Sequence, residues 1–118
     1  MSVDDASAQA DDWCTSEMYF RDTLRTLSLG ADAQIAAVGG PHVAWELRQD
    51  AIDFGSAVVQ SSNGRLSEEI VRGIQVLMDA LHRLPEDSYQ GEAREALRHP
   101  QWREVRELAE ALGGAFEA

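Results

Sequence analysis

The sequence contains no lysine, so that all 10 of its strongly basic residues are arginines. A phosphate loop of the GxxxxGK[ST] type requires a lysine, and a dinucleotide loop requires a preceding strand, which the residues before Gly39 do not predict. Gly39 and Gly40 are therefore interpreted as a connector between helices and not as a phosphate-binding loop.

Cysteine is nearly absent as well. Cys14 is the single cysteine among 118 residues, which excludes an internal disulfide framework and metal sites built on several thiolates. Acidic residues flank it and disfavour a reactive thiolate, so Cys14 is interpreted as a small, half-buried apolar residue.

Long apolar runs are also missing, since no stretch approaches the roughly 18 apolar residues of a membrane-spanning helix. The first residues, MSVDDASAQADDW, show no basic region followed by an apolar run, which a secretory signal requires. We therefore expect a cytoplasmic protein. Because residues 1–11 are small, polar and acidic, we expect a flexible lead there, followed by a single domain over residues 12–114.

Negative charge dominates what is present. The chain carries 21 acidic residues against 10 arginines, a formal net charge of −11. Such a field repels nucleic acid and anionic membranes and attracts a basic protein over long distances. Direct binding to nucleic acid or to a membrane is therefore disfavoured. Acidity also keeps a small protein soluble, and this simpler interpretation stays open.

Apolar residues recur at helical spacing along most of the chain, and no alternating run of β-branched residues competes with them. The pattern predicts an all-α fold, a compact bundle of five to six helices in one domain. We expect helices over residues 12–29, 32–38, 41–61, 68–84, 87–98 and 100–114. The inner face of the first should carry Trp13, Phe20, Leu24 and Leu27. Asp32 and Ser67 are expected to cap the second and fourth helices, and Gly113 and Gly114 to close the last.

The expected helix over residues 41–61 has more apolar surface than one core seam needs. A second stripe of Trp45, Ile52 and Val59 repeats every seven residues along it. Glycine inside a helix costs about 1 kcal/mol relative to alanine, so Gly55 suggests that another backbone passes close by. This helix is therefore either central or in contact with a partner.

The outer face of the last expected helix alternates in charge. Its residues at i and i+4 predict two exposed ion pairs, each worth a few tenths of a kcal/mol. The pairs are Arg103 with Glu107 and Arg106 with Glu110.

Four metal-ligating side chains share one stripe of the third helix, at positions i, i+4, i+8 and i+11. They are His42, Glu46, Asp50 and Asp53. A metal needs ligands from several directions, and the best complements are Asp79 and His82 on the fourth helix. A di-iron bundle uses paired Glu-x-x-His motifs, whereas this chain offers one Asp-x-x-His. We therefore expect no bound metal and no cofactor, and interpret His82 and His99 as residues that interact with carbonyls at helix ends.

Together these patterns favour a binding protein over an enzyme. The leading hypothesis is a small inhibitor of the immunity or antitoxin type, which neutralises a basic bacterial toxin such as a nuclease by masking its active face. Carboxylates would occupy the phosphate-binding face of the partner, and an aromatic side chain would anchor the complex. The expected contact residues are Trp45, Glu46, Asp50, Asp53 and Asp79.

Two alternatives stay open. One is a small metal-dependent hydrolase or oxidase that uses His42, Glu46, Asp79 and His82. The other is a dimeric scaffold or secretion chaperone, in which Trp45, Ile52 and Val59 form the interface of a homodimer.

Overall fold

A computed structural model describes the backbone of residues 3–62 and 64–117, and the side chains of residues 14–62 and 64–117. Within these ranges the chain forms six α-helices, one short 3₁₀ helix and no strand, which confirms the predicted all-α fold. The elements are α1 (Val3–Leu27), α2 (Ala31–Val38), α3 (Val43–Ser61), α4 (Glu68–His82), η1 (Glu86–Ser88), α5 (Ala93–Leu97) and α6 (Gln101–Glu117).

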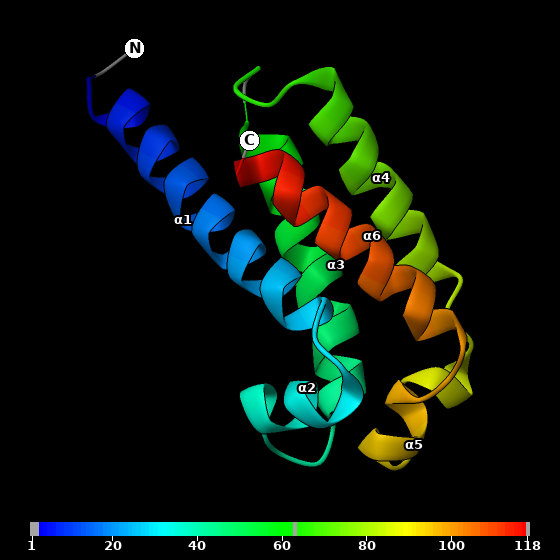
Figure 1. Cartoon of the computed structure of the whole chain (residues 1–118). Coiled ribbons are helices and arrows are strands. Elements are labelled where there is room, and N and C mark those ends of the chain that lie inside the picture. Colours follow the sequence, from blue (N-terminus) through cyan, green and yellow to red (C-terminus); the bar gives the residue numbers. More distant parts are fainter. Residues whose placement is uncertain (1–2, 63, 118) are drawn as a thin grey trace.

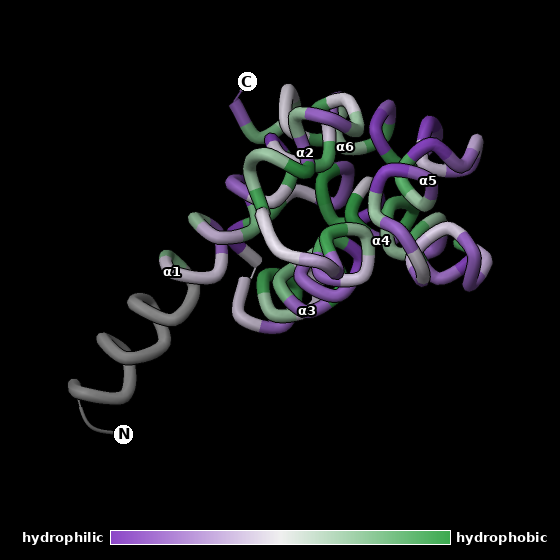
Figure 2. The backbone as a smooth tube through the Cα atoms, turned by 90° about the horizontal axis from the view of Figure 1, so that it is seen from below, coloured by the Kyte–Doolittle hydropathy of each residue, from purple (hydrophilic) through white to green (hydrophobic). Residues whose placement is uncertain are grey.

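Four long helices, α1, α3, α4 and α6, form a bundle, and the short α2 and α5 lie together at one end of it (Figure 1). α1 packs against α3 and α6, and α4 packs against the same two helices, so the order around the bundle is α1, α3, α4, α6. The face between α1 and α3 therefore lies opposite the face between α4 and α6. In Figure 2, many of the strongly hydrophobic segments of these helices lie toward the middle of the bundle.

One face of each long helix builds the core. Phe20, Leu24 and Leu27 of α1 are buried, as their spacing predicted, whereas Trp13 lies outside the residues whose side chains are described. Cys14 of the same helix is exposed, so the half-burial expected of it was wrong. The neighbouring helices contribute Ala44, Leu47, Ala51, Val58, Ile74, Leu77, Leu81, Trp102, Val105, Ala109 and Leu112. Full burial of a large apolar side chain contributes about 1.5–3 kcal/mol, so these contacts hold the bundle together.

The fourth helix follows its prediction closely. The Ser67 hydroxyl accepts a hydrogen bond of 3.2 Å from the backbone N–H of Ile70, and this caps the N-terminus of α4. Glu68 and Glu69 stand in the first turn, where carboxylates interact favourably with the helix dipole. Local signals therefore suffice to place this helix.

The first helix begins earlier than expected. α1 starts at Val3 and not at residue 12, so no helix boundary separates the predicted lead, residues 1–11, from the predicted domain. Three alanines and two early aspartates in this stretch favour a helix by propensity and by their interaction with its dipole. Residues 1–2 lie outside the described part of the chain, and the flexibility expected of residues 1–11 stays a prediction.

The last helix ends later than expected, because Gly113 and Gly114 lie within α6, which continues to Glu117. The Phe116 ring packs edge-to-face against Phe20, with ring centroids 6.0 Å apart, and Arg21 lies over the Phe116 ring at 5.9 Å. These contacts hold the final turn against α1, and they outweigh the helix-breaking tendency of the two glycines.

Two expected helix starts were wrong. The N-cap residue of α2 is Gly30 without a side-chain hydrogen bond, while Asp32 already lies in the first turn, 3.4 Å from Arg94 of α5. Pro41 precedes α3, whose N-cap residue is His42. His42 has φ −119° and ψ 42°, which lies outside the helical region, so the helix begins only at Val43.

The helix expected over residues 87–98 consists of η1 and α5, with a turn between them. Gly91 in this turn has φ 84°, a left-handed conformation that an α-helix does not contain. Trp102 is fully buried, and its indole N–H donates a 2.6 Å hydrogen bond to the carbonyl of Ser88, which is also fully buried. This bond fastens η1 to the core.

Gly55 is closely approached by side chains, not by another backbone as expected. A Cβ atom at this position would meet the Met78 sulfur at 3.0 Å and a ring carbon of Phe20 at 3.2 Å. The missing side chain of Gly55 therefore lets α1 and α4 pack onto the middle of α3.

The ion pair expected between Arg106 and Glu110 does not form, although Arg103 and Glu107 do pair at 3.4 Å. Arg106 instead turns inward and donates hydrogen bonds to the carbonyls of Leu29 at 3.1 Å and Leu97 at 2.6 Å. These carbonyls lie at or just beyond the ends of α1 and α5, where helices leave acceptors unsatisfied. Burial lowers the pKa of the Arg106 guanidinium from its usual range.

Candidate partner-binding face

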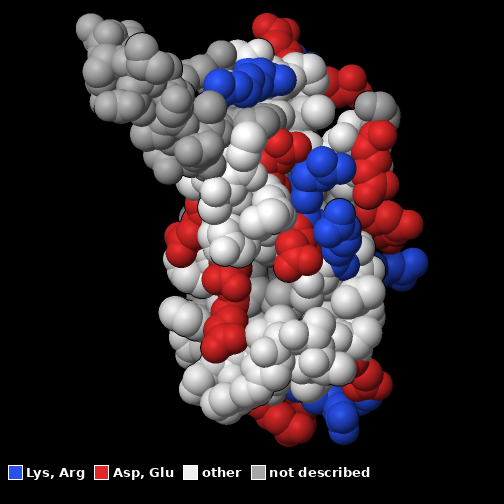
Figure 3. All heavy atoms as spheres, turned by 90° about the vertical axis from the view of Figure 1, so that its left-hand side faces the viewer, with Lys and Arg blue, Asp and Glu red and all other residues white. Residues whose placement is uncertain are grey.

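One side of α3 carries three carboxylates that reach solvent. The opposite side of the helix is buried through Val43, Ala44, Leu47, Ala51, Gly55 and Val58. Glu46, Asp50 and Asp53 follow one another at i, i+4 and i+7, so they share one stripe, which we call the acidic row. Asp50 and Asp53 are exposed and Glu46 is half-buried. In the view of Figure 3, acidic side chains at the left stand apart from the arginines, several of which lie toward the right.

Among the described residues, no cationic side chain pairs with the acidic row. No ion pair joins Glu46, Asp50 or Asp53 to any residue that the structure describes. Asp53 accepts one hydrogen bond, of 3.1 Å, from the side-chain amide of Gln49. Partial burial, followed by the charges of Glu46 and Asp53, raises the pKa of the Asp50 carboxyl. The row is thus a site where a cation from outside would relieve repulsion.

Arg48 stands between Glu46 and Asp50 in sequence, yet its side chain is engaged elsewhere. Its Nε donates a 3.1 Å hydrogen bond to the carbonyl of Leu81 near the end of α4, and its guanidinium lies 4.4 Å from the centre of the Tyr89 ring. Sequence reasoning missed this role, because Leu81 and Tyr89 are distant in the chain. The orientation of Arg48 leaves the acidic row uncompensated.

Trp45 precedes the acidic row directly and is 48 % exposed. The expected apolar stripe of Trp45, Ile52 and Val59 exposes less surface than predicted, because Ile52 and Val59 are half-buried and pack against the core. Val59 also lines the groove between α3 and α4. Trp45 is therefore the one large apolar side chain of the stripe that a partner could contact extensively.

Asp79 does not belong to the acidic row. It lines the groove between α3 and α4, which has a volume of about 330 Å³, together with Met78 and His82. None of the three carboxylates of the row lines this groove. Of the five residues expected to form a contact face, the three carboxylates of the row share one stripe of α3. Trp45 belongs to the neighbouring stripe of the same helix, and Asp79 lines the groove between α3 and α4.

The ligand set of the metal hypothesis does not converge. Among the residues that the structure describes, no group of three or more histidine, cysteine, aspartate or glutamate side chains lies close enough to hold a metal ion. His42 is exposed at the start of α3, whereas Asp79 and His82 line the groove beside α4. The candidate ligands on α3 therefore do not meet the candidate ligands on α4 at a common point.

His99 interacts with the start of a helix and not with carbonyls at a helix end, as was expected. Its Nδ1 accepts a 3.3 Å hydrogen bond from the backbone N–H of Gln101, the first residue of α6. Its Nε2 lies 3.8 Å from a carboxylate oxygen of Asp87. The imidazole therefore satisfies one of the free N–H groups of α6.

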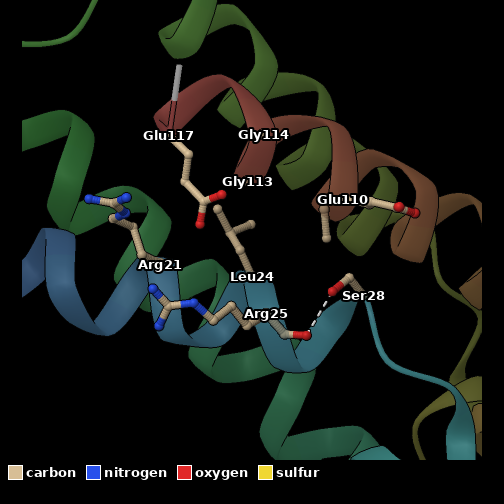
Figure 4. A pocket seen from close by; sticks show the side chains of 9 residues that line it. Arg21, Leu24, Arg25, Ser28, Glu110, Gly113, Gly114 and Glu117 are labelled. Atoms are coloured by element: carbon tan, nitrogen blue, oxygen red, sulfur yellow. Dashed lines mark hydrogen bonds between the residues drawn. The ribbon is translucent and has the colours of Figure 1, made fainter.

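A cavity of about 370 Å³ lies between α1 and α6 (Figure 4). The Glu117 carboxylate points into it from α6, and Arg21 and Arg25 border it from α1. Ser28 is the one residue of the lining with a hydroxyl that could act as a nucleophile. This hydroxyl donates a 2.7 Å hydrogen bond to the Arg25 carbonyl. Among the described residues, no hydrogen bond joins this hydroxyl to Glu110 or Glu117, the two carboxylates that also line the cavity.

The described part of the chain is thus an all-α bundle whose acidic row forms no ion pair. Among the described residues, no helix combines the length and apolar character needed to cross a bilayer. No family model matches the chain, and no curated protein and no solved structure matches it at a significant level.

Proposed function

We propose that this protein is an acidic, protein-binding inhibitor of the immunity or antitoxin type, which acts in the cytoplasm and neutralises a basic bacterial toxin such as a nuclease. The observation that carries the proposal is the acidic row: Glu46, Asp50 and Asp53 stand on one helix stripe without a counter-charge from the described residues. Binding a basic partner would provide that counter-charge.

The mechanism is steric and electrostatic. A nuclease presents cationic side chains where it holds phosphates. The carboxylates of the acidic row would bind these side chains in place of the phosphates of nucleic acid. The net charge of −11 steers a basic partner toward the protein from a distance. Burial of Trp45 at the contact would then slow dissociation, because tryptophan is favoured at the centre of interfaces.

This function requires neither turnover nor a cofactor. The alternative of a metal-dependent hydrolase or oxidase gains no support from the arrangement of His42, Asp79 and His82. Direct binding to nucleic acid stays disfavoured by the net negative charge.

Affinity capture from the native host tests the proposal. Immobilised wild-type protein should retain a basic protein, which mass spectrometry identifies and an activity assay shows to be inhibited. The double variant Asp50→Asn/Asp53→Asn should retain much less of it. The matched control Glu92→Gln/Glu95→Gln removes two exposed charges near α5 and should retain as much as wild type. Equal capture by both variants would remove the acidic row from the contact face.

A further inference from the structure

The face between α4 and α6 contains an apolar groove with a volume of about 360 Å³. Its apolar lining comprises Gly73, Val76, Leu108, Ala111, Leu112 and Ala115. Val76 is 44 % exposed, and its side chain continues the apolar surface of the groove to solvent. Leu112 fills the floor, since a Cβ atom on Gly73 would meet its Cδ1 at 3.1 Å. The groove is therefore shallow and suits a broad apolar contact better than a small ligand.

Two charged residues stand at equal distances from Val76, one in the first turn of α4 and the other at its C-cap. Glu69 lies seven residues before Val76 and Arg83 lies seven residues after it. Seven residues are about two helical turns, so all three side chains share one face. Glu69 is exposed and forms no ion pair with a described residue, while Arg83 pairs with Glu104 of α6 at 3.3 Å across the surface.

We propose that a second copy of this chain binds this face, with the two α4 helices antiparallel about a twofold axis at Val76. In this arrangement Val76 meets Val76 of the other copy. Glu69 of each copy then faces Arg83 of the other, because a twofold axis at position 76 exchanges positions 69 and 83. The sequence of α4 is thus complementary to itself, as an isologous contact requires.

Electrostatics favour a second copy here over a basic partner. Arg72 and Glu69 balance each other in the lining of the groove, and Arg83 and Glu104 balance each other as an ion pair beside it, so the charges at the groove cancel on a chain of net charge −11. A neutral face attracts a basic protein little, and it lets two acidic molecules approach with least repulsion. None of the carboxylates of the acidic row lines the groove between α4 and α6, and α3 lies across the bundle from α6, so the dimer leaves both rows accessible.

Sedimentation equilibrium over a wide concentration range tests the dimer. Wild-type protein should associate reversibly to a dimer, and Val76→Asp should raise its dissociation constant about tenfold or more, because two carboxylates would then meet at the axis. Circular dichroism should show that this variant stays helical. Trp45→Ala, which removes an exposed apolar side chain of α3, should leave the dimer unchanged.

Charge exchange tests the register without changing apolar packing. Glu69→Arg alone and Arg83→Glu alone should each weaken the dimer, and the double variant should restore it, because the opposite charges again face each other. Loss of the exposed Arg83–Glu104 pair costs little by itself. A wild-type chain that stays monomeric, a dimer lost with Trp45→Ala, or a double variant as weak as the singles would overturn the proposal. The capture experiment is independent of all three results.

Discussion

The guanidinium of Arg48 lies 4.4 Å from the centre of the Tyr89 ring, and its Nε donates a hydrogen bond to the carbonyl of Leu81. The basic residue nearest to the acidic row in sequence is therefore used to join α3 to the end of α4. The orientation of Arg48 therefore has two effects. Its contacts with Leu81 and Tyr89 stabilise the fold, and they also keep its positive charge from pairing with Glu46 or Asp50.

Replacement of Arg48 should reduce stability. Arg48→Met keeps most of the apolar stem but loses the hydrogen bond and the cation–π contact, so we expect a loss of about 1–2 kcal/mol in the free energy of unfolding. Urea denaturation measures it. Capture of a basic partner should persist in this variant, because the acidic row is unchanged; unaltered stability would show that the Arg48 contacts contribute nothing.

Two glycines in helices should respond in opposite ways to alanine. At Gly55 the new Cβ would lie 3.0 Å from the Met78 sulfur and 3.2 Å from the Phe20 ring, so Gly55→Ala should cost about 1 kcal/mol or more through overpacking. At Gly114 no atom lies within 4 Å of the new Cβ, and Gly114→Ala should stabilise α6 by about 0.5–1 kcal/mol. Thermal unfolding of the two variants should therefore shift in opposite directions, and a common direction would refute the packing described for Gly55.

The buried contact between Arg106 and Gln34 should be energetically coupled. Gln34 is fully buried and donates hydrogen bonds of 3.2 Å and 3.0 Å to the carbonyls of Thr26 and Leu27, while its side-chain oxygen accepts from Arg106. Gln34→Leu should cost about 1–3 kcal/mol, because these carbonyls lose their partner. In a double-mutant cycle with Arg106→Met, additivity of the two losses would contradict a shared network.

The raised pKa of Asp50 makes stability depend on pH. Because burial and the charges of Glu46 and Asp53 hold this pKa above its ordinary value of 3.8, the folded state binds a proton more readily than the unfolded state. Stability from this group is therefore lost as the pH rises through the folded-state pKa. Asp50→Asn should raise the melting temperature at neutral pH, and this gain should vanish below the ordinary pKa. A melting-temperature gain of the same size at neutral pH and below the ordinary pKa would contradict a raised pKa of Asp50.

The sequence predicts features that depend on local spacing. Helical periodicity alone predicts the buried face of α4 and the common stripe of Glu46, Asp50 and Asp53. The Ser67 cap follows from the preference for serine at this position. Features that depend on contacts between distant segments were missed. Phe116 holds α6 together past its glycines by packing on Phe20, which no local pattern indicates.

The position of Asp79 shows the same limit at the candidate site. Its place on α4 was expected, but the side of the bundle it faces depends on how α4 is rotated against α3, and that rotation is set by core packing. Arg106 is a second case, because the carbonyls of Leu29 and Leu97 that it binds come from helix ends far away in the chain. Spacing along α6 predicted only an ion pair of Arg106 with Glu110, four residues later in the same helix.

The most direct measurement is the association rate of the captured basic partner with wild-type protein, with Asp50→Asn/Asp53→Asn and with the control Glu92→Gln/Glu95→Gln. Stopped-flow mixing at salt concentrations from about 0.05 M to 0.5 M covers the range over which exposed charges become screened. The wild-type rate constant should fall steeply with salt, and the row variant should associate about tenfold more slowly at low salt while the control stays close to wild type. Rates that are indifferent to salt, or equal for the row variant and the control, would contradict recognition of a basic protein through the acidic row.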